Sequence, residues 1–292
     1  MLYTIENKYL RITADTCGAE LKSIVSLDEE LERLWQGDEK SWTGQAPLLF
    51  PLIGRLKEER YDWAGKSYSM PIHGFANRSE FTYVPAGENT LSFTLTDTPE
   101  TYVRYPFHFR LTVRYVLQGR TIRKEHTVEN LTDGEMLYEL GGHEGYNIAL
   151  YAGERMAQYY AEFKNDGLMT YTTDEAIMFN AGLSPVAMDG RRIYLDREVF
   201  ANDALVLANA EDGTVTIGCG GNGRCITVCA PDFPYLGLWT MYRPFDTNYI
   251  CVEPWSSLPD CNYLGYDLKD KPGVRTLAAH ETETLAYTIT VE

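Results

Sequence analysis

The chain is poor in cysteine, in basic residues and in long apolar runs, and each shortage excludes a class of protein. Its 292 residues include six cysteines and no Cys-x-x-Cys pair, a pattern that fits neither a disulfide scaffold nor a zinc finger. Its 26 basic residues face 42 acidic ones, giving a net charge of −16, so nucleic acid and anionic membranes would be repelled. We therefore expect buried free thiols, no metal, no nucleic-acid partner and no membrane partner.

Two further absences concern location. The amino-terminal residues have no basic region followed by an apolar run, and no apolar segment is long enough to cross a bilayer. We therefore expect a cytoplasmic protein.

No internal repeat, low-complexity tract or Pro/Ser-rich linker divides the sequence, so we also expect one domain spanning residues 1–292.

Short alternating segments rich in valine, isoleucine, threonine and tyrosine predict strands along nearly the whole chain. Residues 108–117 place Phe109, Leu111, Val113, Tyr115 and Leu117 on one face. Gln118-Gly119 then turns the chain into 121–130, which predicts an antiparallel hairpin.

The best helical pattern, 153–163, predicts either a single helix or another pair of strands. The glycine-dense stretch 218–224 lacks the Gly-Lys-Ser/Thr ending of a phosphate loop and predicts a hairpin tip.

Three short segments each hold one side chain that can transfer a proton. They are Pro-Ile-His-Gly-Phe at 71–75, Gly-Gly-His-Glu-Gly-Tyr-Asn at 141–147 and Cys-Val-Glu-Pro-Trp at 251–255, with His73, His143 and Glu253 as the candidates. Glycine beside each histidine allows a sharp bend or a close approach to a ligand. The apolar neighbours of Glu253 should raise the pKa of its carboxyl group. An imidazole and a carboxylate in one cleft can donate and accept protons without a cofactor.

Two other residues are weaker candidates on their own. Arg55 follows the apolar run 47–53 and could orient a hydroxyl-rich ligand or pair with a structural carboxylate. Asp203 lies in an Asn-Asp cluster of the kind that often only makes a turn. The remaining histidines, His108, His126 and His280, lack a comparable setting and are expected to be structural.

These segments, in this order, resemble the aldose 1-epimerase (galactose mutarotase) family, and within it the LacX-like branch. The resemblance extends over nearly the full length and includes Gly54-Arg55, His73-Gly-Phe-Ala76, Gly141-Gly-His143, 200–205 and Glu253-Pro-Trp255. It implies an all-β fold, the galactose mutarotase-like β supersandwich of large antiparallel sheets, around a cleft for a small-molecule sugar. It also implies a mutarotase, which interconverts the α and β anomers of an aldohexose and needs no cofactor.

The resemblance further implies a role for each candidate residue. His143 would be the general acid toward the ring oxygen and Glu253 the general base toward the anomeric hydroxyl. His73 and Arg55 would hold and polarise the sugar, and Asp203 would bind a ring hydroxyl. One departure concerns Glu144, which stands where the family usually has proline. Its carboxylate could raise the pKa of His143 or point to solvent, and Tyr146 then becomes a candidate wall of the pocket.

Three alternative functions remain open. A hexose-6-phosphate epimerase would need several basic side chains around the phosphate, and the sequence offers Arg55 and Arg78. A non-catalytic sugar-binding protein could share the fold, although His143 and Glu253 argue for a reaction. Glycoside hydrolysis normally needs two carboxylates, which one glutamate and two histidines do not supply.

Overall fold

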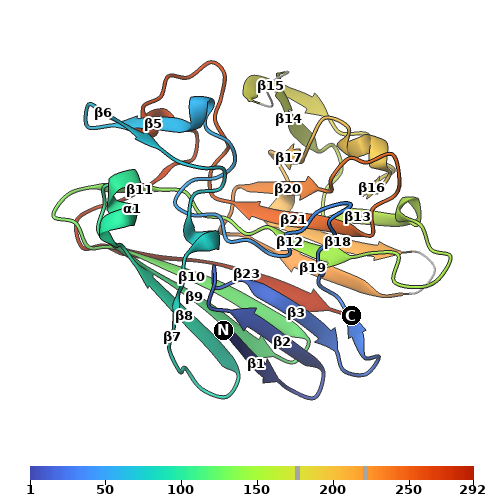
Figure 1. Cartoon of the computed structure of the whole chain (residues 1–292). Coiled ribbons are helices and arrows are strands. Elements are labelled where there is room, and N and C mark those ends of the chain that lie inside the picture. The colour runs from blue at the N-terminus through green and yellow to red at the C-terminus, as the bar shows by residue number, and fades with distance from the viewer. Residues whose placement is uncertain (175–177, 220–222) are drawn as a thin grey trace.

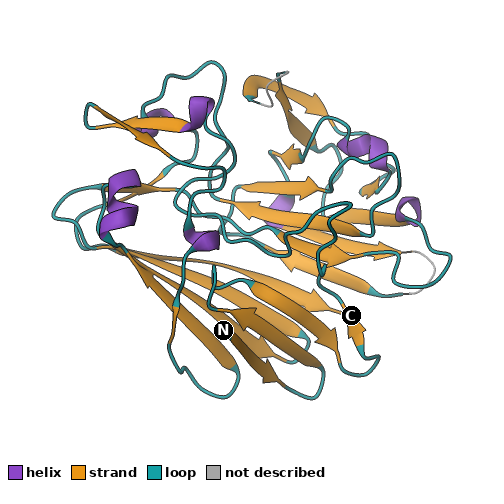
Figure 2. Ribbon diagram, viewed as in Figure 1, coloured by secondary structure: helices purple, strands orange, loops and turns teal. Residues whose placement is uncertain are grey.

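The computed structural model describes residues 1–174, 178–219 and 223–292, and strands make up nearly all of its regular structure (Figure 2). Its α-helix, α1, spans Pro99–Arg104. Single 3₁₀ turns occur at η1 Lys57–Glu59, η2 Ala76–Arg78, η3 Met156–Gln158, η4 Arg197–Phe200, η5 Glu211–Gly213 and η6 Leu268–Asp270. Within the described ranges, no helix is long and apolar enough to span a membrane.

A nine-stranded antiparallel sheet, here called the base sheet, extends from β7 at the lower left of Figure 1 to β16 at the right. In spatial order its strands are β16 Arg192–Tyr194, β13 Tyr159–Phe163, β18 Thr214–Cys219, β19 Cys225–Cys229, β23 Thr282–Val291, β10 Thr121–Asn130, β9 Phe109–Gln118, β8 Thr90–Thr96 and β7 Thr82–Tyr83. The predicted alternation of β9 is confirmed, because Phe109, Leu111, Val113, Tyr115 and Leu117 are all buried. Gly119, with φ +61°, lies in the two-residue loop that joins β9 to β10, a position that suits glycine.

A six-stranded sheet carries the segments that contain His143 and Glu253. Its order is β12 Glu144–Asn147, β21 Tyr249–Trp255, β20 Tyr235–Trp239, β17 Leu205–Leu207, β14 Met169–Thr173 and β15 Phe179–Pro185. Every residue of β21 is buried, which explains why that segment reads as an almost continuous apolar run rather than as an alternating one.

The smaller sheets complete the structure. One sheet contains β1 Leu2–Glu6, β2 Leu10–Asp15, β3 Leu21–Ser26 and β4 Leu31–Glu32; the two-stranded sheets are β5 Arg60–Trp63 with β6 Lys66–Ser69, and β11 Met136–Tyr138 with β22 Arg275–Leu277.

The four-stranded and six-stranded sheets cover the same face of the nine-stranded sheet. Tyr115 of β9 donates a hydrogen bond to the Ala19 carbonyl beside β3 (2.7 Å), and its register partner on β10, Lys124, contacts Glu144 of β12. The opposite face of β9 and β10 carries charged pairs such as Arg114 with Glu125. One large core therefore lies between the nine-stranded base sheet on one side and the four-stranded and six-stranded sheets on the other.

The predictions for segments 153–163 and 218–224 have different outcomes. The segment 153–163 is neither one helix nor a pair of strands, because the turn η3 leads into the single strand β13. Tyr159, Ala161 and Phe163 of β13 alternate into the core, and pairing on both sides with β16 and β18 overrides the weak helical pattern. In the glycine-dense stretch, residues 220–222 lie outside the described residues, and the flanking strands β18 and β19 pair antiparallel, as a hairpin requires.

Candidate active site

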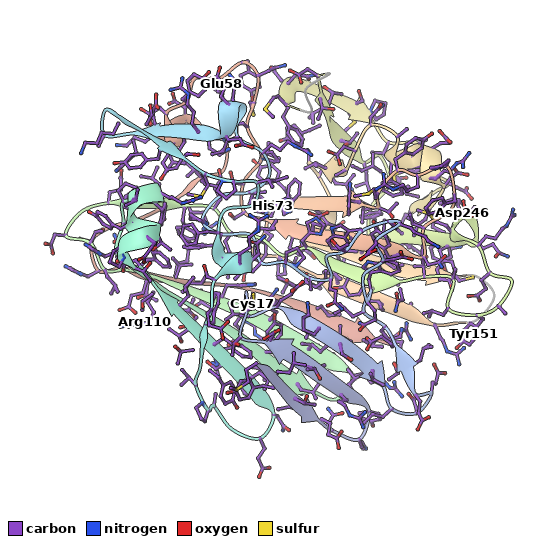
Figure 3. All side chains as sticks on the ribbon, viewed as in Figure 1. Cys17, Glu58, His73, Arg110, Tyr151 and Asp246 are labelled. Carbon is purple, nitrogen blue, oxygen red and sulfur yellow. The ribbon has the colours of Figure 1, made fainter. Side chains whose placement is uncertain are left out.

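A cavity of about 540 Å³ opens where loops of the first 80 residues meet the six-stranded sheet. This volume is in the range of cavities that bind small molecules. Of the six residues predicted from the sequence to form the site, five line the cavity: Arg55, His73, His143, Asp203 and Glu253. In Figure 3 the labelled His73 lies near the centre of the molecule, beside the ends of β20 and β21.

The pairing of β12 with β21 brings His143 and Glu253 together. Glu144 is paired with Val252 in the antiparallel register, so the preceding residue, His143, lies alongside Glu253. His143 Nε2 lies 3.3 Å from Glu253 Oε2, and the two side chains are 9% and 2% exposed. Two segments more than a hundred residues apart in the chain thus deliver an imidazole and a carboxylate to one wall of the cavity.

Burial shifts the pKa values of this pair in opposite directions. Burial raises the pKa of the Glu253 carboxyl well above its usual value, and the nearby negative charge of Asp203 adds to the effect. Burial also lowers the pKa of His143 well below its usual value, with a further contribution from His73. Burial thus disfavours the charged form of each group, and the 3.3 Å contact provides a path for a proton between them, as a pair that exchanges the roles of acid and base requires.

The backbone at His73 fixes the orientation of its ring. His73 and Gly74 both have positive φ, +62° and +73°, and a Cβ added to Gly74 would lie 2.2 Å from the Phe50 carbonyl oxygen. His73 Nδ1 accepts a hydrogen bond from the Gly54 backbone N–H (3.2 Å). Burial and the positive charges of Arg55 and Arg78 lower the pKa of His73 to about 4. His73 is thus a neutral imidazole at pH 7, and its Nε2 carries the hydrogen.

Arg55 and Asp203 form an ion pair in the lining of the cavity. Their closest charged atoms, Arg55 Nη1 and Asp203 Oδ2, lie 3.6 Å apart, and the side chains are 49% and 29% exposed. Asp203 has φ +77°, so the Asn-Asp cluster does make a turn, and that turn directs the carboxylate into the cavity wall. The Arg55 guanidinium can donate forked N–H hydrogen bonds to a polar ligand, and the Asp203 carboxylate can accept hydrogen bonds from it.

Glu144 and Tyr146 do not lie where the sequence led us to expect them. Glu144 neither raises the pKa of His143 nor points to solvent. It is fully buried, and its Oε1 accepts hydrogen bonds from Lys124 (2.7 Å) and Tyr287 (2.6 Å). Adjacent residues of a strand point to opposite faces, so Glu144 points away from the cavity. Tyr146 points the same way, is fully buried in the core and does not line the cavity.

Tryptophans form a part of the cavity that the sequence did not reveal. Three of the five tryptophans of the chain line it, Trp42, Trp239 and Trp255. The Trp42 ring is stacked on the His143 imidazole with ring centroids 5.0 Å apart, and the Trp239 ring approaches it edge-on at 5.5 Å. The one local signal for Trp42 is Gly44 two residues later, where a Cβ would lie 2.5 Å from the Trp42 ring.

Together, the fold and the cavity define a class: a β-sheet protein of the galactose mutarotase-like fold with a buried histidine–glutamate pair at the wall of a cavity of about 540 Å³. The sequence pattern described as Aldose 1-epimerase matches residues 1–264. The chain belongs to the aldose 1-epimerase family.

Known proteins and structures resemble the chain over its full length. It is 33% identical to the LacX proteins, plasmid and chromosomal, of Lactococcus lactis subsp. lactis, over 100% of this chain and 99% of theirs. The galactose mutarotase related enzyme from Lactobacillus acidophilus superposes with a TM-score of 0.94 at 30% identity, covering 100% of this chain and 97% of that one. A galactose mutarotase-like protein from Lactobacillus casei gives 0.94 at 29% identity, covering both chains completely.

Proposed function

We propose that the protein is an aldose 1-epimerase that interconverts the α and β anomers of an aldohexose such as glucose or galactose. The observation that carries this proposal is the buried contact of 3.3 Å between His143 and Glu253 at the wall of the cavity. Anomer exchange needs one group to take a proton and another to give one within a single site. The pair supplies both groups.

The reaction follows from the roles of the two residues. Glu253 removes the proton of the C1 hydroxyl while the bond between C1 and the ring oxygen breaks, and His143 gives a proton to that oxygen. The open-chain aldehyde then rotates about the C1–C2 bond. In closure the two residues exchange roles, and C1 receives the ring oxygen on its other face. No atom is gained or lost, and the direct contact between the two residues supports their exchange of roles.

The surrounding residues hold the sugar. Neutral His73 directs an Nε2–H donor toward hydroxyl oxygens, while Arg55 donates and Asp203 accepts hydrogen bonds. Trp42, Trp239 and Trp255 supply the apolar surface against which the C–H faces of a pyranose can pack.

Optical rotation tests the proposal. Freshly dissolved α-glucose or α-galactose should reach anomeric equilibrium faster with the wild-type protein. Glu253→Gln, which keeps the size of the side chain but cannot act as a base, should lose activity by about 10²–10⁴-fold. The matched control is Glu125→Gln, on the solvent face of β10. Full activity in Glu253→Gln would remove Glu253 from the mechanism, and binding of sugar without any acceleration would indicate a non-catalytic sugar-binding protein.

A second candidate substrate is a hexose 6-phosphate, and one observation favours it. Arg55 and Arg78 both line the cavity, and both lower the pKa of His73 by their positive charge. Arg55 faces Asp203, whereas Arg78 is exposed at the rim. If the natural substrate is phosphorylated, Arg78→Gln should raise KM for glucose 6-phosphate about tenfold or more and leave KM for glucose unchanged. Equal KM values for both sugars in both proteins would exclude a phosphate site at Arg78.

A further inference from the structure

The thiol of Cys251 lies beside the histidine–glutamate pair. Cys251 and Glu253 are two residues apart on β21, so their side chains point to the same face. A ring nitrogen of His143, the Cys251 sulfur and a carboxylate oxygen of Glu253 all lie within 4.8 Å of one another, and all three residues are buried. The proton-transfer mechanism gives Cys251 no role.

A ring nitrogen, a sulfur and a carboxylate oxygen together are a set of ligands that suits zinc. Thiolate and imidazole are ligands that zinc favours, and zinc also binds carboxylate oxygens. Zinc lies about 2.0–2.3 Å from such ligands, so tetrahedral ligand atoms are roughly 3.4–3.6 Å apart. His143 Nε2 and Glu253 Oε2 are already 3.3 Å apart, and the sulfur, which lies within 4.8 Å of the other ligand atoms, has to approach by at most about 1.4 Å.

Charge and access also favour such an ion. A thiolate and a carboxylate together neutralise a divalent cation, so the buried complex would carry no net charge, which avoids the cost of burying one. His143 and Glu253 line the cavity, whereas Cys251, next to them and on the same face of β21 as Glu253, is fully buried and does not line it. The fourth coordination position would therefore face the cavity, where water or a sugar hydroxyl can occupy it.

We propose that His143, Cys251 and Glu253 form a binding site for zinc, and that zinc bound there inhibits the enzyme. Coordination engages the lone pairs that His143 and Glu253 need for proton transfer, and it displaces the thiol proton of Cys251 to solvent. Inhibition rests on the proposed epimerase function, but zinc binding does not. The two are therefore measured separately.

Binding is measured on the full chain, first with zinc in competition with a chromophoric chelator. Wild type should bind one zinc ion, and Cys251→Ala should weaken binding by about tenfold or more. Cys225→Ala removes a partly exposed thiol elsewhere and should change nothing. With cobalt as the probe, wild type should show a thiolate-to-cobalt charge-transfer band that Cys251→Ala lacks. Equal affinity in wild type and Cys251→Ala, or a loss in Cys225→Ala instead, would overturn the site.

Inhibition is measured by optical rotation. Without zinc, Cys251→Ala should match wild type, with an unchanged unfolding midpoint in urea to show that it is folded. Zinc should slow wild type, EDTA should restore it, and the zinc concentration for half inhibition should rise about tenfold or more in Cys251→Ala. If that variant is unstable, Cys251→Ser takes its place. Stoichiometric binding to wild type without inhibition would overturn the inhibitory role, and a wild type inactive on every sugar would overturn the epimerase proposal while the binding result stands.

Discussion

Trp42 covers one face of the His143 imidazole, and we expect this contact to support the proposed role of His143 in proton transfer. The rings are inclined by 26°, with centroids 5.0 Å apart. Trp42→Ala would expose His143 to water and release its orientation, so kcat should fall by about tenfold or more. The rate of mutarotation at saturating sugar measures this effect.

Two matched variants make that test specific. Trp42→Phe keeps a ring over His143 and should recover most of the rate. Trp63→Ala removes a tryptophan that packs on Phe107 and does not line the cavity, and should retain wild-type kcat. Wild-type kcat in Trp42→Ala would show that the stacked ring does not support His143.

The residues that sequence reasoning found share a local signal. His73 and His143 lie beside glycine, and Glu253 lies in an apolar run, so the pattern around each residue pointed to a site. Trp42 and Trp239 have no comparable pattern, because their contacts with His143 come from segments about a hundred residues away. Tyr146 was misplaced because alternation along β12 directs it into the core, on the same side as Glu144.

Among the strands and turns, the local sequence predicts individual elements, but it does not predict the contacts between different sheets. The hairpin of β5 and β6 has its turn at Ala64-Gly65, both with positive φ, as a two-residue hairpin turn requires. Glu144, by contrast, was read only as a neighbour of His143. Its partners Lys124 and Tyr287 come from β10 and β23, and no spacing within a segment predicts contacts between strands of different sheets.

That buried contact joins the edge strand β12 to the base sheet. Lys124 and Glu144 are each fully buried. Glu144→Gln would leave the Lys124 ammonium without a compensating charge, so the free energy of unfolding should fall by about 3–5 kcal/mol. Urea unfolding measures this change. Glu125→Gln, on the same strand as Lys124 but paired with Arg114 on the solvent face, should cost at most about 1 kcal/mol. Similar losses in the free energy of unfolding of the two variants would show that the buried Lys124–Glu144 pair stabilises the fold no more than the exposed Arg114–Glu125 pair does.

At the scale of the whole molecule, the sheets are also joined by a cluster of polar residues near the carboxyl-terminal strand. Glu283 of β23 accepts hydrogen bonds from Arg275 of β22 (Nε to Oε2, 2.8 Å) and from Tyr138 of β11 (2.5 Å). The Arg275 guanidinium lowers the pKa of the Glu283 carboxyl below its usual value of 4.5, against an opposing effect of partial burial. The cluster thus ties the sheet of β11 and β22 to the nine-stranded sheet through a charge that depends on pH.

The direction of that dependence follows from the lowered pKa. The unfolded chain takes up the Glu283 proton at a higher pH than the folded protein does, so the pair stabilises the fold fully above pH 4.5 and loses its contribution as pH falls through the folded-state pKa. Glu283→Gln should therefore lower the free energy of unfolding by about 1.5–3 kcal/mol at pH 7, and the gap to wild type should narrow below pH 4.5.

Comparing wild type with Glu283→Gln at each pH separates the contribution of the Arg275–Glu283 pair from that of the other charged residues. With a net charge of −16, mild acid also relieves repulsion across the whole surface, a change that wild type and variant share. Urea unfolding of both at pH 7, 5.5 and 4 therefore gives the contribution of the pair as a difference. A gap that stays constant over this range, or widens in acid, would show that the charge of Glu283 does not link the two sheets.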